Sequence, residues 1–118
     1  LKLPACDFIK VDVEGMELPV LQGAVETLRK YRPILYVEND QAEKSQALVE
    51  WIKQQGYDLY WHKPNMYNPN NYEGLKENIF TVKQKTEKGW IESYYVSQNM
   101  LCLPIEDGIV IEGFEKVQ

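Results

Sequence analysis

The sequence contains no long hydrophobic run, which excludes a membrane-spanning helix, since such a helix needs about 18–20 consecutive apolar residues. Cysteine and histidine are also scarce: Cys6 and Cys102 lie near opposite ends of the chain, and His62 is the single histidine. Two isolated cysteines without partner histidines are a poor basis for a metal site, so we expect free thiols in a reducing compartment. No lysine and arginine block stands out and the net charge is −5, which gives nucleic-acid binding little electrostatic support.

The glycines never fall in a G-x-G pattern; Gly15, Gly23, Gly56 and Gly74 each stand alone. The glycine-rich loop with which nucleotide-binding domains hold phosphate at the start of a helix is therefore lacking. What is present is typical of a globular protein, with 44% hydrophobic and 26% charged residues among 118. This length is sufficient for one domain with one modest core.

The first half of the chain alternates between strand and helix patterns. Residues 7–13 place β-branched side chains at every second position, which predicts a strand with a buried face. In residues 18–28, apolar side chains recur at spacings of three and four, which predicts a helix that Gly23 weakens in its middle and Pro33 terminates. Residues 34–38 predict a second strand.

The next helix is expected to begin at Asp40, which forms a variant of the capping box with Glu43, and to stop at Gly56. Residues 57–61 predict a third strand, and residues 99–103 predict the last one.

A long polar and aromatic stretch, residues 63–78, is expected to be irregular. After it, residues 79–82 and 91–96 predict a hairpin joined by a polar connection, residues 83–89.

Alternating strands and helices favour an α/β fold with a mostly parallel sheet and both helices on one face. The other face of the strand at residues 7–13, and its free edge, then lack a cover, so we expect the sheet to be incomplete in this sequence.

Acidic residues lie at the carboxyl ends of the first two predicted strands, where open α/β sheets bind ligands. The end of the first strand presents Asp12, Glu14 and, past the turn, Glu17, and the end of the second presents Glu38 and Asp40. A cap explains Asp40 and the helix start explains Glu17, whereas Asp12 is favoured as a functional group. Glu14 and Glu38 stay open between structural and functional roles.

Two sequence blocks carry a family resemblance. DFIKVDVEGMELPVLQGA followed by RPILYVEND is similar to the paired signature of FkbM-type methyltransferases. The later segments YNPNNYEG and SQNMLCLP resemble a subset of the same family, whereas residues 81–95 fit less well.

The resemblance implies a Rossmann-like class I methyltransferase fold, of which residues 1–118 form the C-terminal portion of a single domain, with an antiparallel last strand. The N-terminal half, which would bind most of the cofactor, is expected outside these residues, so that the fragment alone is expected to be inactive. The implied reaction of the complete enzyme moves the methyl group of S-adenosylmethionine to an oxygen of a sugar or natural product.

The resemblance also implies roles for individual residues. Asp12 would be the base or a metal ligand, with Glu38 as the second acid, and Mg²⁺ assistance is the less favoured version. His62 would be an alternative base, although a lone histidine at a strand end is more often structural or exposed to solvent. The methionine end of the cofactor would be bordered by Asp12, Val13 and Glu14. The acceptor side would be formed by Trp61, Tyr67, Asn68 and Asn71, unless this stretch is an ordinary surface loop.

Two other readings compete with the methyltransferase. One is a non-catalytic relic that serves as an interaction module, and the other is a different α/β enzyme or nucleotide-binding domain. For the enzyme we expect a cytoplasmic protein with a small-molecule or glycan acceptor and no nucleic-acid or membrane partner; the oligomeric state is left open.

Overall fold

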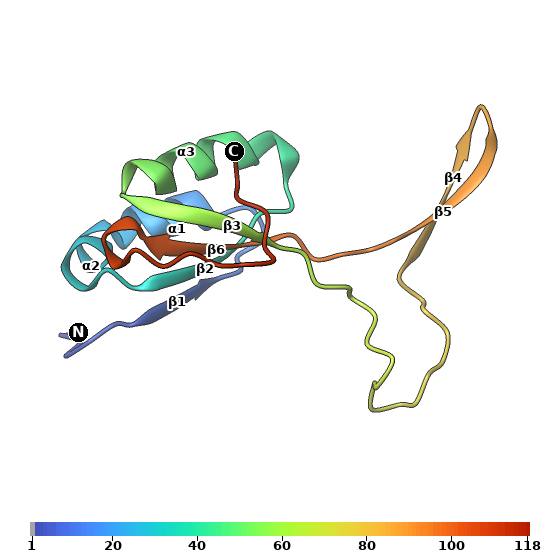
Figure 1. The fold of residues 1–118 in the computed structure, drawn as a ribbon, viewed down its shortest axis with the longest axis horizontal. Coiled ribbons are helices and arrows are strands. Elements are labelled where there is room, and N and C mark those ends of the chain that lie inside the picture. Colours follow the sequence, from blue (N-terminus) through green and yellow to red (C-terminus); the bar gives the residue numbers. More distant parts are fainter. Residues whose placement is uncertain (1) are drawn as a thin grey trace. The chain divides into compact units, whose positions relative to one another are not determined.

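The computed structural model describes residues 2–118 and divides the chain into two compact units. The first unit comprises the residues up to His62 together with Gln98–Gln118, and the second comprises Lys63–Ser97. The elements of the first unit are β1 (Phe8–Val11), α1 (Glu17–Gly23), α2 (Val25–Tyr31), β2 (Ile34–Glu38), α3 (Ala42–Gln54), β3 (Tyr57–His62), β6 (Asn99–Pro104) and a 3₁₀ turn at Ile105–Asp107 (Figure 1).

The four strands of the first unit form one sheet in the order β1-β2-β6-β3. β1 and β2 pair in parallel, whereas β6 is antiparallel to both of its neighbours. The α/β class and the antiparallel last strand are therefore confirmed. The sheet is mixed: β1, β2 and β3 run in one direction, and β6, the antiparallel last strand, lies between β2 and β3.

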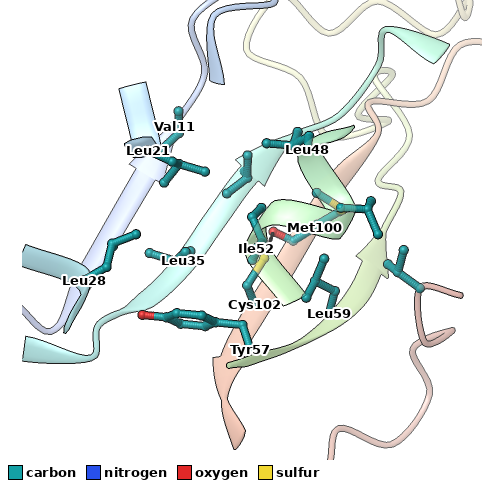
Figure 2. Close-up of a cluster of buried hydrophobic side chains, with 13 residues drawn as sticks. Val11, Leu21, Leu28, Leu35, Leu48, Ile52, Tyr57, Leu59, Met100 and Cys102 are labelled. Carbon is teal, nitrogen blue, oxygen red and sulfur yellow. Dashed lines mark hydrogen bonds between the residues drawn. The ribbon is translucent and has the colours of Figure 1, made fainter. Parts of the chain in front are cut away.

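One face of this sheet carries the hydrophobic core. Every second side chain of the strands packs against the helices, and Figure 2 shows this cluster. The buried members from strands and helices include Val11, Leu35, Val37, Leu59, Met100, Cys102, Leu21, Leu28, Leu48 and Ile52. Each such side chain stabilises the fold by roughly 1.5–3 kcal/mol through its removal from water. The helices thus cover one face, as expected, and the opposite face carries aliphatic side chains such as Leu101 and the buried Leu103 beside polar and aromatic ones.

The first helical pattern is interrupted at Ala24, where α1 ends and α2 begins. This agrees with the expected weakening at Gly23, because glycine is a poor helix former. The stop after α3 is also confirmed: Gly56 has φ +82°, a conformation that L side chains rarely adopt. Both cysteines are free, with Cys102 buried and Cys6 half-buried.

The predicted cap at Asp40 is wrong. Gln41 precedes the first residue of α3 and makes no capping hydrogen bond through its side chain. The backbone stays paired beyond β2, because the N–H of Asn39 donates to the carbonyl of Gln98 at 2.8 Å. The Asn39 amide also donates to Ser45 Oγ at 2.9 Å. This extended pairing delays the helix past Asp40.

The second unit contains β4 (Thr81–Thr86) and β5 (Gly89–Tyr94), which pair as an antiparallel hairpin. The hairpin is confirmed, but the predicted connection is too long, because Thr86 pairs with Gly89 and only two residues remain for the turn. The strands extend into polar sequence because β5 is exposed throughout and needs no apolar alternation. None of the helices described in residues 2–118 has the length and apolar character to cross a membrane.

Arg32 joins three parts of the first unit. Its guanidinium donates to the carbonyls of Gln55 and Gly56 at the end of α3, both at 2.9 Å, and to the Glu106 carboxylate. It also lies over the Tyr57 ring, 4.5 Å from the centroid. Arg32 directly follows α2, and its side chain binds the end of a different helix, α3.

Replacement of Arg32 should therefore lower the stability of the fold. We expect Arg32→Ala to reduce the free energy of unfolding in urea by about 2 kcal/mol, through the loss of charge-assisted hydrogen bonds to two carbonyls. Arg32→Lys should recover part of this loss, because lysine keeps the charge without the planar fork. The control is Arg29→Ala, at an exposed position of α2. Equal stability of the Arg32→Ala and Arg29→Ala proteins would contradict the joining role.

Candidate functional site

Four polar residues lie in one row at the end of the sheet. Asn99 is paired with Glu38 on one side and with His62 on the other. Asp12 directly follows Val11, whose partner Val37 directly precedes Glu38, so Asp12 and Glu38 lie at the same level. Directly opposed residues of a sheet point to the same face, and this face is not the one covered by the helices. We call Asp12, Glu38, Asn99 and His62 the edge row.

The turn after β1 is built around Glu17. Its Oε1 accepts hydrogen bonds from the N–H groups of Val13, at 3.2 Å, and Gly15, at 3.0 Å. Glu17 is only 6% exposed, and it shapes the backbone that carries Asp12 and Glu14. These hydrogen bonds support the structural role of Glu17, which is to hold the turn.

The backbone conformation at Gly15 favours glycine, and the missing side chain leaves room for the ends of the Gln41 and Lys44 side chains. Its φ of +88° is strained for other residues. A Cβ atom at this position would lie 2.6 Å from Lys44 Nζ, which donates to the Gly15 carbonyl at 3.0 Å. Glu14 also has a positive φ, +52°, so two successive residues of the turn leave the usual backbone regions. Residues 14–17 therefore serve in part to form this sharp turn.

Glu38 has a strongly perturbed carboxyl group. Burial raises its pKa to about 7, and the carboxylates of Asp40, Asp12 and Glu14 add to the increase. Its Oε2 atom is buried and receives no hydrogen bond from the described residues. The contact with Asp12 joins two acceptors, and it becomes a hydrogen bond when one carboxyl is protonated. Glu38 can therefore exchange a proton near neutral pH, beside the Asp12 carboxyl group.

Asp12 is more open to solvent than Glu38. Its side chain is 46% exposed and lies 3.5 Å from Lys10 Nζ. The structure brings Asp12 and Glu38 together as the sequence predicted. In residues 2–118, however, no group of three histidine, cysteine or acidic side chains is arranged to hold a metal ion.

His62, at the other end of the edge row, is held by aromatic neighbours. Its Nδ1 lies 2.7 Å from the Tyr36 hydroxyl, and its ring centroid lies 5.5 Å from that of Phe114. Burial raises the pKa of Tyr36, which keeps the phenol protonated. Tyr36 and Asn99 were missed as site residues. The signal for Tyr36 was its place two residues before Glu38 on one strand, which gives both the same face.

Trp61 does not join the edge row. It is adjacent to His62 on β3, and neighbouring side chains of a strand point to opposite faces. Trp61 packs against the hydrophobic core, and its backbone N–H donates to the Glu115 carbonyl at 2.8 Å. The sequence correctly placed Trp61 at a strand end but could not assign its face.

The other three predicted acceptor residues lie in the second unit, where their polar groups fold the loop itself. The Tyr67 hydroxyl and the Asn71 amide both donate to the Leu75 carbonyl, at 2.8 and 2.7 Å. Asn71 Oδ1 accepts from the Leu75 N–H, and Asn68 Oδ1 accepts from the Asn70 N–H, both at 2.9 Å. With neighbouring residues they line a cavity of about 270 Å³. Their hydrogen bonds give them a structural role in this loop.

Comparison with protein families gives one match. Residues 2–59 match the family model of the methyltransferase FkbM domain. The match includes Asp12 and Glu38 and ends before His62, so the resemblance indicated by the sequence motifs is confirmed for this part of the chain. Comparison with curated proteins and with solved structures gave no match.

Removal of the Glu17 carboxylate should loosen the turn after β1. We expect Glu17→Ala to lower the free energy of unfolding by about 1–3 kcal/mol, because two backbone N–H groups lose their acceptor. Urea denaturation measures this loss. Glu26→Ala, at an exposed position of α2, is the matched control. A loss no larger than that of the control would show that Glu17 does not hold the turn.

Glu38 should make stability depend on pH. Because its pKa in the folded chain is about 7, above that of the unfolded chain, its contribution to stability is fully present below about pH 4.5 and is lost as the pH rises through 7. Glu38→Gln should therefore raise the melting temperature at pH 8 more than at pH 5. Thermal denaturation at both pH values checks this, with Glu26→Gln as control. An equal effect of Glu38→Gln at both pH values would contradict the raised pKa.

Proposed function

We propose, on the premise that residues 2–59 are similar to the methyltransferase FkbM domain, that this chain is the C-terminal part of an S-adenosylmethionine-dependent methyltransferase. The acceptor would be a hydroxyl group of a sugar or natural product. The observation that carries the proposal is the Asp12–Glu38 pair, which provides a carboxyl group of pKa about 7 at the end of two adjacent parallel strands.

The arrangement of the sheet supports a Rossmann-like fold. β1, β2 and β3 run in one direction, and the helices cover one face. Ligands of such folds bind beyond the carboxyl ends of the strands, where the edge row lies. The strands and glycine-rich turn that would bind the rest of the cofactor are proposed to belong to the N-terminal half of the same domain.

The acids at this edge fit the charge of the proposed cofactor. S-adenosylmethionine carries a sulfonium and an ammonium group, both positive. The buried Glu38 Oε2 lacks a donor, and the carboxylates of Asp40, Asp12 and Glu14 lie close enough to raise the pKa of Glu38. Asp12, Val13 and Glu14 would border the methionine end. The bound cofactor supplies a methyl group on a good leaving group, so the protein mainly positions the acceptor and removes its proton.

The Asp12–Glu38 pair would take that proton. A general base works best when its pKa lies near the operating pH, and Glu38 meets this condition. As the acceptor oxygen becomes methylated, its proton passes to the carboxylate pair, where Asp12 and Glu38 share it. Within the pair, Asp12 would be the carboxyl group that is more exposed to solvent. The mechanism is proposed without a metal ion.

Taken by itself, the cavity of the second unit would suit the apolar face of a sugar. Because Tyr67, Asn68 and Asn71 hold the loop through their polar groups, contact would occur through the Tyr67 ring rather than through new hydrogen bonds.

Methyl transfer by the full-length protein tests the proposal. We expect binding of S-adenosylmethionine in calorimetry and transfer of a labelled methyl group to a sugar hydroxyl. Glu38→Gln should lower kcat by about 10²–10⁴-fold while cofactor binding is retained, because a general base is lost. Asp12→Asn should lower kcat and also weaken the binding of S-adenosylmethionine. Transfer in the presence of a chelator separates the metal-free from the Mg²⁺-assisted mechanism.

The matched control is Glu50→Gln, on α3, where the carboxylate accepts a hydrogen bond from Gln46 on an exposed surface. Unchanged kcat in Glu38→Gln would remove Glu38 from the chemistry. Absence of cofactor binding by the wild-type protein would favour the non-catalytic interaction module instead.

A further inference from the structure

The hydrogen bond between Tyr36 and His62 crosses a whole strand. Tyr36 lies on β2 and His62 on β3, with β6 between them. Tyr36 pairs with Leu101 of β6, which pairs with Tyr60 of β3, so these residues and the edge row share one face of the sheet. Phe114 contacts the His62 ring as well, with an interplanar angle of 51°. Two aromatic residues from different segments therefore restrict the orientation of this imidazole.

The direction of the hydrogen bond follows from the chemistry of its partners. A phenol hydroxyl is a good donor, and the unprotonated nitrogen of a neutral imidazole is a good acceptor. Burial raises the pKa of Tyr36, so the hydroxyl keeps its proton. Tyr36 then donates to Nδ1, and the neutral ring carries its own proton on Nε2. In this tautomer Nε2 is a hydrogen-bond donor and cannot act as a base.

The remaining nitrogen is available to a ligand. Within residues 2–118, Nε2 of His62 has no hydrogen-bond partner, and the side chain is half-buried. Glu38 lies two strands away at the same level, which separates the two backbones by about 10 Å. The edge row thus presents a proton acceptor at Glu38 and a donor at His62, on opposite sides of Asn99.

We propose that Tyr36 is a positioning residue that holds His62 as an Nε2–H donor, and that this donor binds a second oxygen of the methyl acceptor. The inference rests on the proposed function and narrows the acceptor to a molecule with at least two oxygens, such as a sugar ring, of which one faces Glu38 and another faces His62. His62 is then a binding residue and not the base.

The tautomer can be tested without any methyl transfer. In two-bond ¹H–¹⁵N NMR spectra of the full-length protein at pH 8, we expect the Nε2–H form of His62. Tyr36→Phe should shift the His62 ¹⁵N signals toward a mixture of both tautomers. Tyr57→Phe is the matched control, because that hydroxyl is buried without a partner among the described residues and lies on the core side of the sheet. A wild-type Nδ1–H form, or identical spectra of the wild type and Tyr36→Phe, would overturn the positioning role.

A pair of His62 variants tests the donor with substrate. The amide nitrogen of His62→Gln takes the approximate place of Nε2, whereas that of His62→Asn takes the place of Nδ1. We expect the KM for a sugar acceptor to rise by about threefold in His62→Gln and about tenfold in His62→Asn, as for one lost hydrogen bond. The KM for S-adenosylmethionine should stay constant in both.

An equal fall of kcat in both variants, at unchanged KM, would identify His62 as a base and overturn the donor role. If the wild-type protein transfers no methyl group, the proposed function fails, whereas the NMR result still decides the role of Tyr36.

Discussion

The pairing of β6 between β2 and β3 is the constraint on which the rest of the first unit depends. Its two antiparallel ladders set the level at which Glu38, Asn99 and His62 meet. The same strand places Met100 and Cys102 in the core on the opposite face. A slip by one residue would exchange the two faces of β6 and remove Asn99 from the row. Burial of the core side therefore determines the polar edge as well.

Local contacts at the strand ends fix the backbone that carries the edge row. At the end of β1, Glu17 binds two backbone N–H groups and Gly15 allows a close approach of Lys44. After β2, Asn39 keeps the backbone extended and delays α3. At the far end of the sheet, Arg32 binds the last carbonyls of α3. The contacts at the ends of β1 and β2 fix the backbone around Asp12 and Glu38, where burial and then the neighbouring carboxylates raise the pKa of Glu38.

Burial and charge divide the edge row into two chemical roles. Burial, and after it the neighbouring carboxylates, raise the pKa of Glu38 to about 7, and the Tyr36 hydroxyl contacts Nδ1 of His62. A carboxyl group that exchanges a proton and a histidine that donates a hydrogen bond suit a methyl acceptor with several oxygens. The similarity of residues 2–59 to the methyltransferase FkbM domain indicates the class of chemistry, and the edge row provides groups with which to test it.

The sequence by itself determined much of this protein. Alternation of β-branched residues located β1, the run at Ile34–Glu38 matched β2, and the D-x-E-G-x-E block indicated both the turn and the acids at its start. These features depend on local periodicity and backbone preference, and both are set by residues that are close together in the chain. Asp40 failed as a cap because a long-range bond to Gln98 competed with local preference. Only the tertiary structure placed β6 inside the sheet, turned Trp61 toward the core and His62 toward the edge row, and joined Tyr36 to His62. Strand order and register depend on contacts between residues far apart in the chain, and no local pattern contains that information.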